Sequence, residues 1–148
     1  MLFNGILRLF SFIISTFAEM ISTLIQNNVK RKILISLIGI IVLIPIGLYS
    51  RHLNWIPEET GDAIWAMMVF CFWRIILVKK GLNLVALVSL LHSFLVEFSQ
   101  LIRWPWLVSF RGTFIGHMML GQGFLWTDLL AYLIGITIIY WVFRQLIR

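Results

Sequence analysis

The chain has 148 residues, of which 61% are hydrophobic and only 12% are charged. A soluble domain carries about twice that charged fraction, so the composition excludes an ordinary soluble domain and predicts a single integral membrane domain. The net charge of +6 does not indicate nucleic-acid binding, because the basic residues stand at the ends of apolar runs, where they set membrane topology. Cys71 is the single cysteine, which excludes an intramolecular disulfide and a thiol metal site.

The first segment, residues 2–26, has a polar residue at every third or fourth position of an otherwise apolar sequence. This narrow stripe predicts a helix of about 37 Å, which is long enough to cross a bilayer and also suits an amphipathic helix lying in the interface. Both interpretations stay open. We do not expect a cleaved signal peptide, because Arg8 interrupts the apolar run. Residues 1–29 are therefore expected to extend a membrane domain of residues 30–148.

Four longer apolar runs predict an all-α membrane protein built as a bundle of four transmembrane helices. The predicted spans are residues 33–50, 62–78, 82–102 and 124–143. A long loop, residues 103–123, is expected before the last span. Trp104 and Trp106 at its start are typical of the membrane interface, and its glycines favour an apolar loop that folds tightly or dips into that interface.

Charged residues separate the two ends of this predicted bundle. One end carries seven basic residues: Lys30, Arg31, Lys32, Lys79, Lys80, Arg144 and Arg148. The other end carries three arginines and five acids: Arg51, Arg103, Arg111, Glu58, Glu59, Asp62, Glu97 and Asp128. The positive-inside rule predicts that the Lys30 cluster and the C-terminus are cytoplasmic.

The stretch from Ser89 to Arg103 collects polar side chains on one face of a predicted helix, and that face must look at other helices or at a water-filled cavity. Glu97 is its central acid, and an unpaired charge at bilayer depth costs about 2.5–3.5 kcal/mol. Ser93 and Gln100 share its face at helical spacing. Glu97 is either an interhelical polar clamp with an arginine or a ligand or proton site.

Two other acids, Asp62 and Asp128, fall near the starts of predicted spans, where the helix dipole favours an anion. Tyr132 follows Asp128 by one turn. Arginines near this end either pair with the acids or bind an anion. The predicted binding residues are Asp62, Ser93, Glu97, Gln100, Arg103, Arg111, Asp128 and Tyr132. No metal or cofactor is expected, because the histidines lack ligand spacing and the glycines of residues 112–123 do not form a phosphate-binding motif.

Four sequence blocks carry a family resemblance: GDAIWAMMVF (61–70), VEFSQL (96–101), RGTFIG (111–116) and LGQGFLWTDLLAYLIGI (120–136). They closely resemble a bacterial membrane family known as domain of unknown function 2809, over about residues 30–143. The resemblance implies a short four-span protein of the inner membrane without an assigned activity.

A second pattern, Glu97-x-x-Gln100, then Arg111, then Asp128 with Gly135 seven residues later, is similar to VanZ-like proteins. This resemblance implies a role facing the cell envelope. Tyr132 stands where that family often has asparagine, so the pattern does not carry over any chemistry.

Three functions are compatible with these observations. The first is an accessory protein whose polar end binds an envelope lipid, another envelope molecule or a membrane-protein partner. The second is a membrane-embedded enzyme acting on a lipid or lipid-linked phosphate, with Glu97 and Asp128 as acid and base. The third is a small transporter component. We favour the first, because no activated nucleophile is visible. A small bundle that spans the lipid bilayer is expected to need a partner or a second copy to close its polar face.

Overall fold

A computed structural model describes residues 15–16, 28–50, 53, 56–57, 59–121 and 123–147, without the side chain of Met118. In these ranges all regular secondary structure is helical, which confirms the predicted all-α class. Apart from residues 15–16, the helix predicted over residues 2–26 lies outside the described residues. The helices are α2 (Asn28–Ser50), α3 (Glu59–Ile76), α4 (Leu82–Ser99), α5 (Pro105–Arg111), α6 (Phe114–Leu120) and α7 (Trp126–Leu146).

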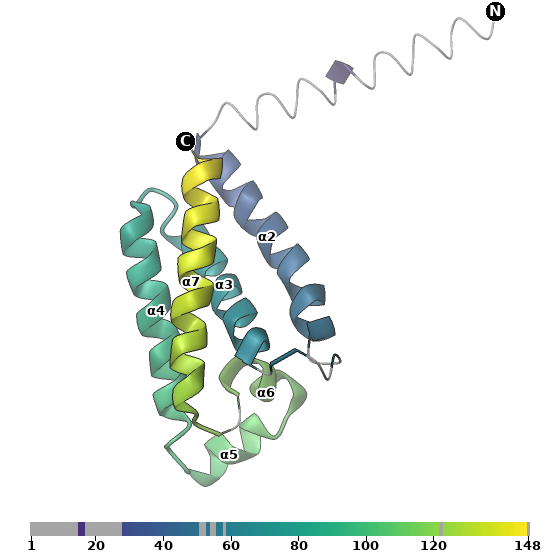
Figure 1. Cartoon of the computed structure of the whole chain (residues 1–148), viewed down its shortest axis with the longest axis vertical. Helices are drawn as coiled ribbons and strands as arrows, with labels where there is room; N and C mark the ends of the chain where they lie inside the picture. Colours follow the sequence, from purple (N-terminus) through teal and green to yellow (C-terminus); the bar gives the residue numbers. More distant parts are fainter. Residues whose placement is uncertain are drawn as a thin grey trace, which may run out of the picture.

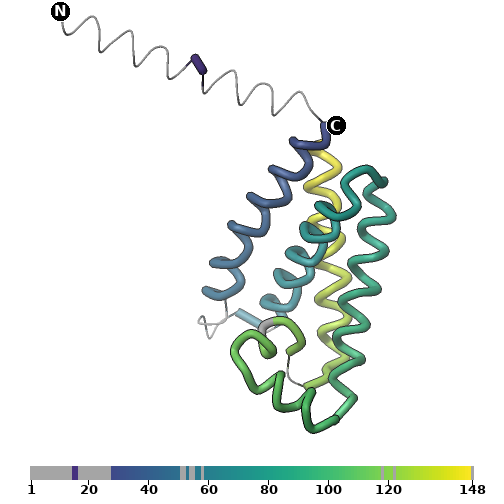
Figure 2. The backbone as a smooth tube through the Cα atoms, turned by 180° about the vertical axis from the view of Figure 1, so that it is seen from behind, coloured from purple at the N-terminus to yellow at the C-terminus, as the bar shows by residue number. Residues whose placement is uncertain are grey.

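The four long helices run alternately up and down along one axis (Figure 1). Helix α3 packs against α2, α4 and α7, and α7 also packs against α4. The opposite view shows α5 and α6 gathered at one end of the bundle, where α3 and α7 begin and α4 ends (Figure 2). Residues that are distant in the sequence therefore meet at two opposite ends.

Three of the described helices, α2, α4 and α7, are long and apolar enough to cross a membrane. The remaining predicted span, residues 62–78, corresponds to α3. This helix is not among the three that are long and apolar enough to cross a membrane. The physical reason is charge, since α3 contains Glu59, Asp62 and Arg74 within 18 residues. Hydropathy therefore identifies three candidate spans rather than the four expected.

The interior of the bundle is formed by aromatic and aliphatic side chains of α3, α4 and α7. Phe70 and Phe143 pack edge to face with ring centroids 5.4 Å apart. Near the middle of α7, Gly135 lets this helix approach the α3 backbone, because a Cβ atom at this position would overlap the carbonyl oxygen of Ala63. This contact fixes the separation of the two helices in their first halves.

The prediction of a loop over residues 103–123 is only partly correct, because this segment contains the two short helices α5 and α6. Pro105 occupies the first turn of α5, and the Thr113 hydroxyl caps α6 by accepting a hydrogen bond from the Gly116 N–H at 3.0 Å. Both local signals are present in the sequence. Each helix has seven residues, which is too short to show an apolar period.

Candidate functional site

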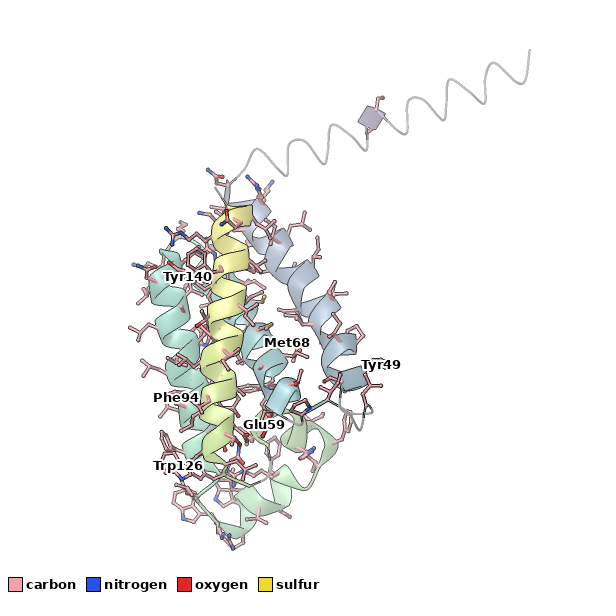
Figure 3. The ribbon with its side chains drawn as sticks, in the orientation of Figure 1. Tyr49, Glu59, Met68, Phe94, Trp126 and Tyr140 are labelled. Carbon is pink, nitrogen blue, oxygen red and sulfur yellow. The ribbon has the colours of Figure 1, made fainter. Side chains whose placement is uncertain are left out.

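The described carboxylates gather at the end of the bundle that carries α5 and α6. Glu59 and Asp62 lie in the first turn of α3, Asp128 lies in the first turn of α7, and Glu97 lies in the last turn of α4. Glu59 is visible beside this end (Figure 3). The up-and-down order of the helices explains the grouping, because two N-termini and one C-terminus meet there. We call this part of the molecule the acidic end.

Glu97 is the centre of a hydrogen-bond network that joins α4 to α7, and its side chain is fully buried. Its Oε1 accepts a hydrogen bond from the backbone N–H of Leu125 at 2.9 Å. Its Oε2 accepts one from the Tyr132 hydroxyl and one from the Gln100 amide, both at 2.8 Å. A carboxylate offers about four lone-pair positions, so three donors satisfy most of its capacity.

Helix electrostatics distinguish Glu97 from the other acids of this end. Asp62 and Asp128 occupy first turns, where the positive end of the helix dipole stabilises an anion. Glu97 occupies a last turn, where the dipole has the opposite sign. A buried charge in that position needs compensation by donors, and the three hydrogen bonds supply it.

Asp128 is buried beside this network. The Thr127 hydroxyl donates to its Oδ1 over 3.3 Å, which is a long bond for an O–H donor. Its carboxylate lies close enough to those of Glu97 and Glu59 for their negative charges to repel one another, and the Asp62 carboxylate lies near the uncharged Tyr132 hydroxyl. The acidic end therefore concentrates negative charge on the ends of three helices.

The two arginines of the predicted site, Arg111 and Arg103, differ in burial. Arg111 is buried and donates to the backbone of α4, with Nη1 3.0 Å from the Ile102 carbonyl oxygen and Nη2 2.6 Å from that of Ser99. Nη2 also lies 3.1 Å from the Ser99 hydroxyl. These carbonyls follow the end of α4, so Arg111 compensates its negative dipole. Arg103 is exposed to solvent.

Ser93 is buried one turn before Glu97, and its hydroxyl donates to the Ser89 carbonyl at 3.0 Å, within α4. The structure therefore brings Glu97, Gln100 and Tyr132 into one network, with Asp128 and Asp62 beside it. Ser93 makes its hydrogen bond along its own helix. The site prediction as a whole stays a prediction, because no bound molecule tests it.

Sequence reasoning missed two contributors to this end. One is the backbone N–H of Leu125, which precedes the first turn of α7. Backbone amides at a helix start lack partners within the helix, so the predicted start of the last span was the signal that could have identified this donor. Gly121 is the other: its φ of +65° suits glycine, and a Cβ atom there would stand 2.8 Å from Gln100 Nε2. The other amide atom, Gln100 Oε1, is buried, and no described residue donates a hydrogen bond to it.

Metal binding has no support in the part of the chain that the structure describes, where no group of three His, Cys, Asp or Glu side chains is arranged to hold an ion. His92 instead packs against two indole rings, with centroid distances of 6.3 Å to Trp65 and 5.9 Å to Trp73. The arrangement at the acidic end can fix helices and present carboxylates to a ligand.

No solved structure matches the chain. A family model described as "Protein of unknown function (DUF2809)" matches residues 51–136, which run from the segment before α3 through most of α7. The match includes every predicted binding residue and more than half of the 148 residues. It confirms the predicted family resemblance, and the chain belongs to the DUF2809 family.

Proposed function

We propose that this chain is a four-span protein of the bacterial inner membrane, with α3 as the fourth crossing helix. Helices α3 and α4 have 18 residues each, or about 27 Å at 1.5 Å per residue, and α3 packs among the three apolar helices. Glu59 and Asp62 stand at its first turn. Arg74 is buried near its other end, where Nη1 donates to the carbonyl oxygens of Leu77, Val78 and Lys80 at 3.1–3.3 Å.

The positive-inside rule then gives the orientation. The lysine-rich turn between α3 and α4 and the starting residues of α2 lie at the end opposite the acidic end. Basic residues next to spans favour the cytoplasmic side, so the acidic end would face the cell envelope.

We further propose that the acidic end binds an envelope molecule that carries a positively charged group, such as an ethanolamine headgroup. One observation carries this proposal: at this end the buried arginine makes more described hydrogen bonds than Asp128 does. The guanidinium of Arg111 donates three hydrogen bonds to Ser99 and Ile102 at the end of α4 and just beyond it, whereas the described bond of Asp128 is a single long contact. Carboxylates of Glu59 and Asp62 stand nearby, and a cation offsets the repulsion of neighbouring negative charges.

The test is native mass spectrometry of the full chain, extracted gently and exposed to equal amounts of phosphatidylethanolamine and phosphatidylglycerol. The variants are Asp62→Asn and Asp128→Asn, which keep side-chain size and remove one charge each. Lys80→Gln is the matched control, because it removes one charge at the opposite end. We expect wild type and the control to retain more phosphatidylethanolamine, and each Asp variant to lose that preference severalfold.

Three results would contradict the proposal. Equal retention of phosphatidylethanolamine by wild type and both Asp variants would exclude a headgroup site at the acidic end. A stronger retention of phosphatidylglycerol would assign the site to an anion. Co-purification of a polypeptide in place of lipid, lost in the Asp variants, would replace the lipid by a membrane-protein partner.

A further inference from the structure

The two short helices at the acidic end expose an unusual amount of apolar surface. In α5 the exposed large side chains include Trp106, Val108 and Phe110, and Trp104 precedes them. In α6 they include Phe114, which is 75% exposed. Contiguous apolar patches of this kind are rare on surfaces that face water, so another phase or molecule covers them.

We propose that residues 104–120, the interfacial hairpin, insert into the bilayer leaflet that surrounds the acidic end, at the boundary of headgroups and acyl chains. The proposal does not depend on the binding function proposed above. It specifies a lipid surface as the partner of α5 and α6.

Charge supports a lipid surface. Arg111 is the only residue of the interfacial hairpin with a formal charge, and it is 6% exposed because its guanidinium turns inward to the end of α4. The outer surface of the hairpin is thus uncharged. Three of its bulky exposed residues are Trp104, Trp106 and Phe110, and indole rings prefer the membrane interface.

The exposed apolar surface of the hairpin also continues that of the candidate spans. Leu95 on α4 is 69% exposed and Trp126 at the start of α7 is 71% exposed. Between them, Phe98 stacks on Phe124 with centroids 5.8 Å apart, and Phe124 contacts Trp126 at 4.9 Å. Helices α4 and α7 need hydrocarbon around such surfaces, and the exposed side chains of Leu101 and Ile102 extend the apolar surface of α4 toward the hairpin.

Helix length places the hairpin at the boundary. Each short helix has seven residues, or about 10 Å, whereas the hydrocarbon core is about 30 Å thick. The short helices therefore do not cross the core. They follow the end of α4, whose 18 residues extend about 27 Å, which brings the hairpin to the level where the core ends.

The distribution of exposure around α5 favours lipid over a second copy of the chain. Only Leu107 and Arg111, one turn apart, are buried, and the remaining side chains of α5 are exposed around most of the helix. A flat protein interface would cover one face of such a helix. A fluid lipid phase contacts every exposed face.

The test uses nitroxide labels on single cysteines in the full chain, reconstituted in phospholipid vesicles, with Cys71 replaced by Ala. Labels at Trp106 and Phe114 probe the hairpin, Leu95 is the lipid control and Lys80 is the aqueous control. Power saturation compares collisions with apolar oxygen and with a water-soluble nickel chelate. We expect collisions with oxygen to exceed those with nickel severalfold at both hairpin sites, approaching the ratio at Leu95.

Ser109 supplies a further label site, because it is small, exposed and on the hairpin. It keeps the test decisive if replacing an aromatic residue disturbs folding. Nickel-dominated collisions at all hairpin sites, as at Lys80, would place the hairpin in water and overturn the proposal. Low collision rates with both reagents, together with spin–spin coupling between chains, would overturn it in favour of a second copy.

Discussion

Replacing Tyr132 by Phe removes one hydrogen bond from the Glu97 network and leaves the ring in place. The lost donor lies 2.8 Å from Glu97 Oε2, in a fully buried pair. Hydrogen bonds to charged groups contribute about 1.5–3 kcal/mol, whereas measured bonds between membrane helices reach at most about 1.7 kcal/mol. Glu97 keeps two donors, so we expect the free energy of unfolding to fall by about 1–1.5 kcal/mol.

The measurement is equilibrium unfolding in mixed micelles, with sodium dodecyl sulfate as denaturant and far-ultraviolet circular dichroism as the signal. Tyr140→Phe is the matched control on the same helix, because its hydroxyl donates to Asn83 Oδ1 at 2.7 Å in an exposed pair. We expect the control to lose less than about 0.5 kcal/mol. Equal losses in the two variants would refute the reasoning, because buried and exposed hydrogen bonds would then be equivalent here.

A double-mutant cycle with Glu97→Gln separates the bond from general damage. The side-chain amide introduced by this change presents an N–H group where Glu97 accepts hydrogen bonds, so the single variant should be destabilised more than Tyr132→Phe. In the Glu97→Gln background the further loss on removing the Tyr132 hydroxyl should shrink by at least about 0.5 kcal/mol. Additive losses would show that the two side chains do not stabilise one another.

Two further changes test the contacts around the network. Gly135→Ala should strongly lower the midpoint of thermal unfolding, because the added Cβ atom overlaps the Ala63 carbonyl oxygen. The control is Gly81→Ala, which should change the midpoint little in the same thermal scan, because no atom lies within 4 Å of the added Cβ. Arg111→Gln should leave the carbonyl of Ser99 without its charged donor and destabilise the chain by about 1–3 kcal/mol, with faster proteolysis after α4. Unchanged cleavage in that variant would mean that Arg111 does not hold the end of α4.

The sequence predicted the helical class and the alternation of the long helices, because apolar runs and basic clusters report directly on membrane partition and topology. It indicated the family through the resemblance of four sequence blocks. Residues 33–50, 82–102 and 124–143 correspond to α2, α4 and α7 within a few residues. The structure of residues 103–123 could not be predicted in the same way. Its two helices depend on packing at the acidic end and on local caps such as Thr113, which carry no periodic pattern.

The sequence predicted three side chains of the Glu97 network, but it did not predict all of the contacts between them. Spacing along α4 placed Gln100 on the face of Glu97, and the structure joins the two by a hydrogen bond. Tyr132 was selected only as a neighbour of Asp128, and the fold gives its hydroxyl to Glu97 instead. The pairing of Tyr132 with Glu97 depends on how far α4 and α7 are shifted relative to one another along the bundle axis. No periodicity within one helix determines that shift.

Glu97 is also the acid whose position is hardest to explain by helix structure alone. Helix structure accounts for the positions of the acids of α3 and α7, because first turns favour negative charge. Glu97 opposes the dipole of α4 and needs donors from two other parts of the chain. Its network therefore joins the end of α4 to the start of α7, on either side of the interfacial hairpin. A ligand bound at Asp128 would therefore lie beside the junction that Glu97 forms between α4 and α7.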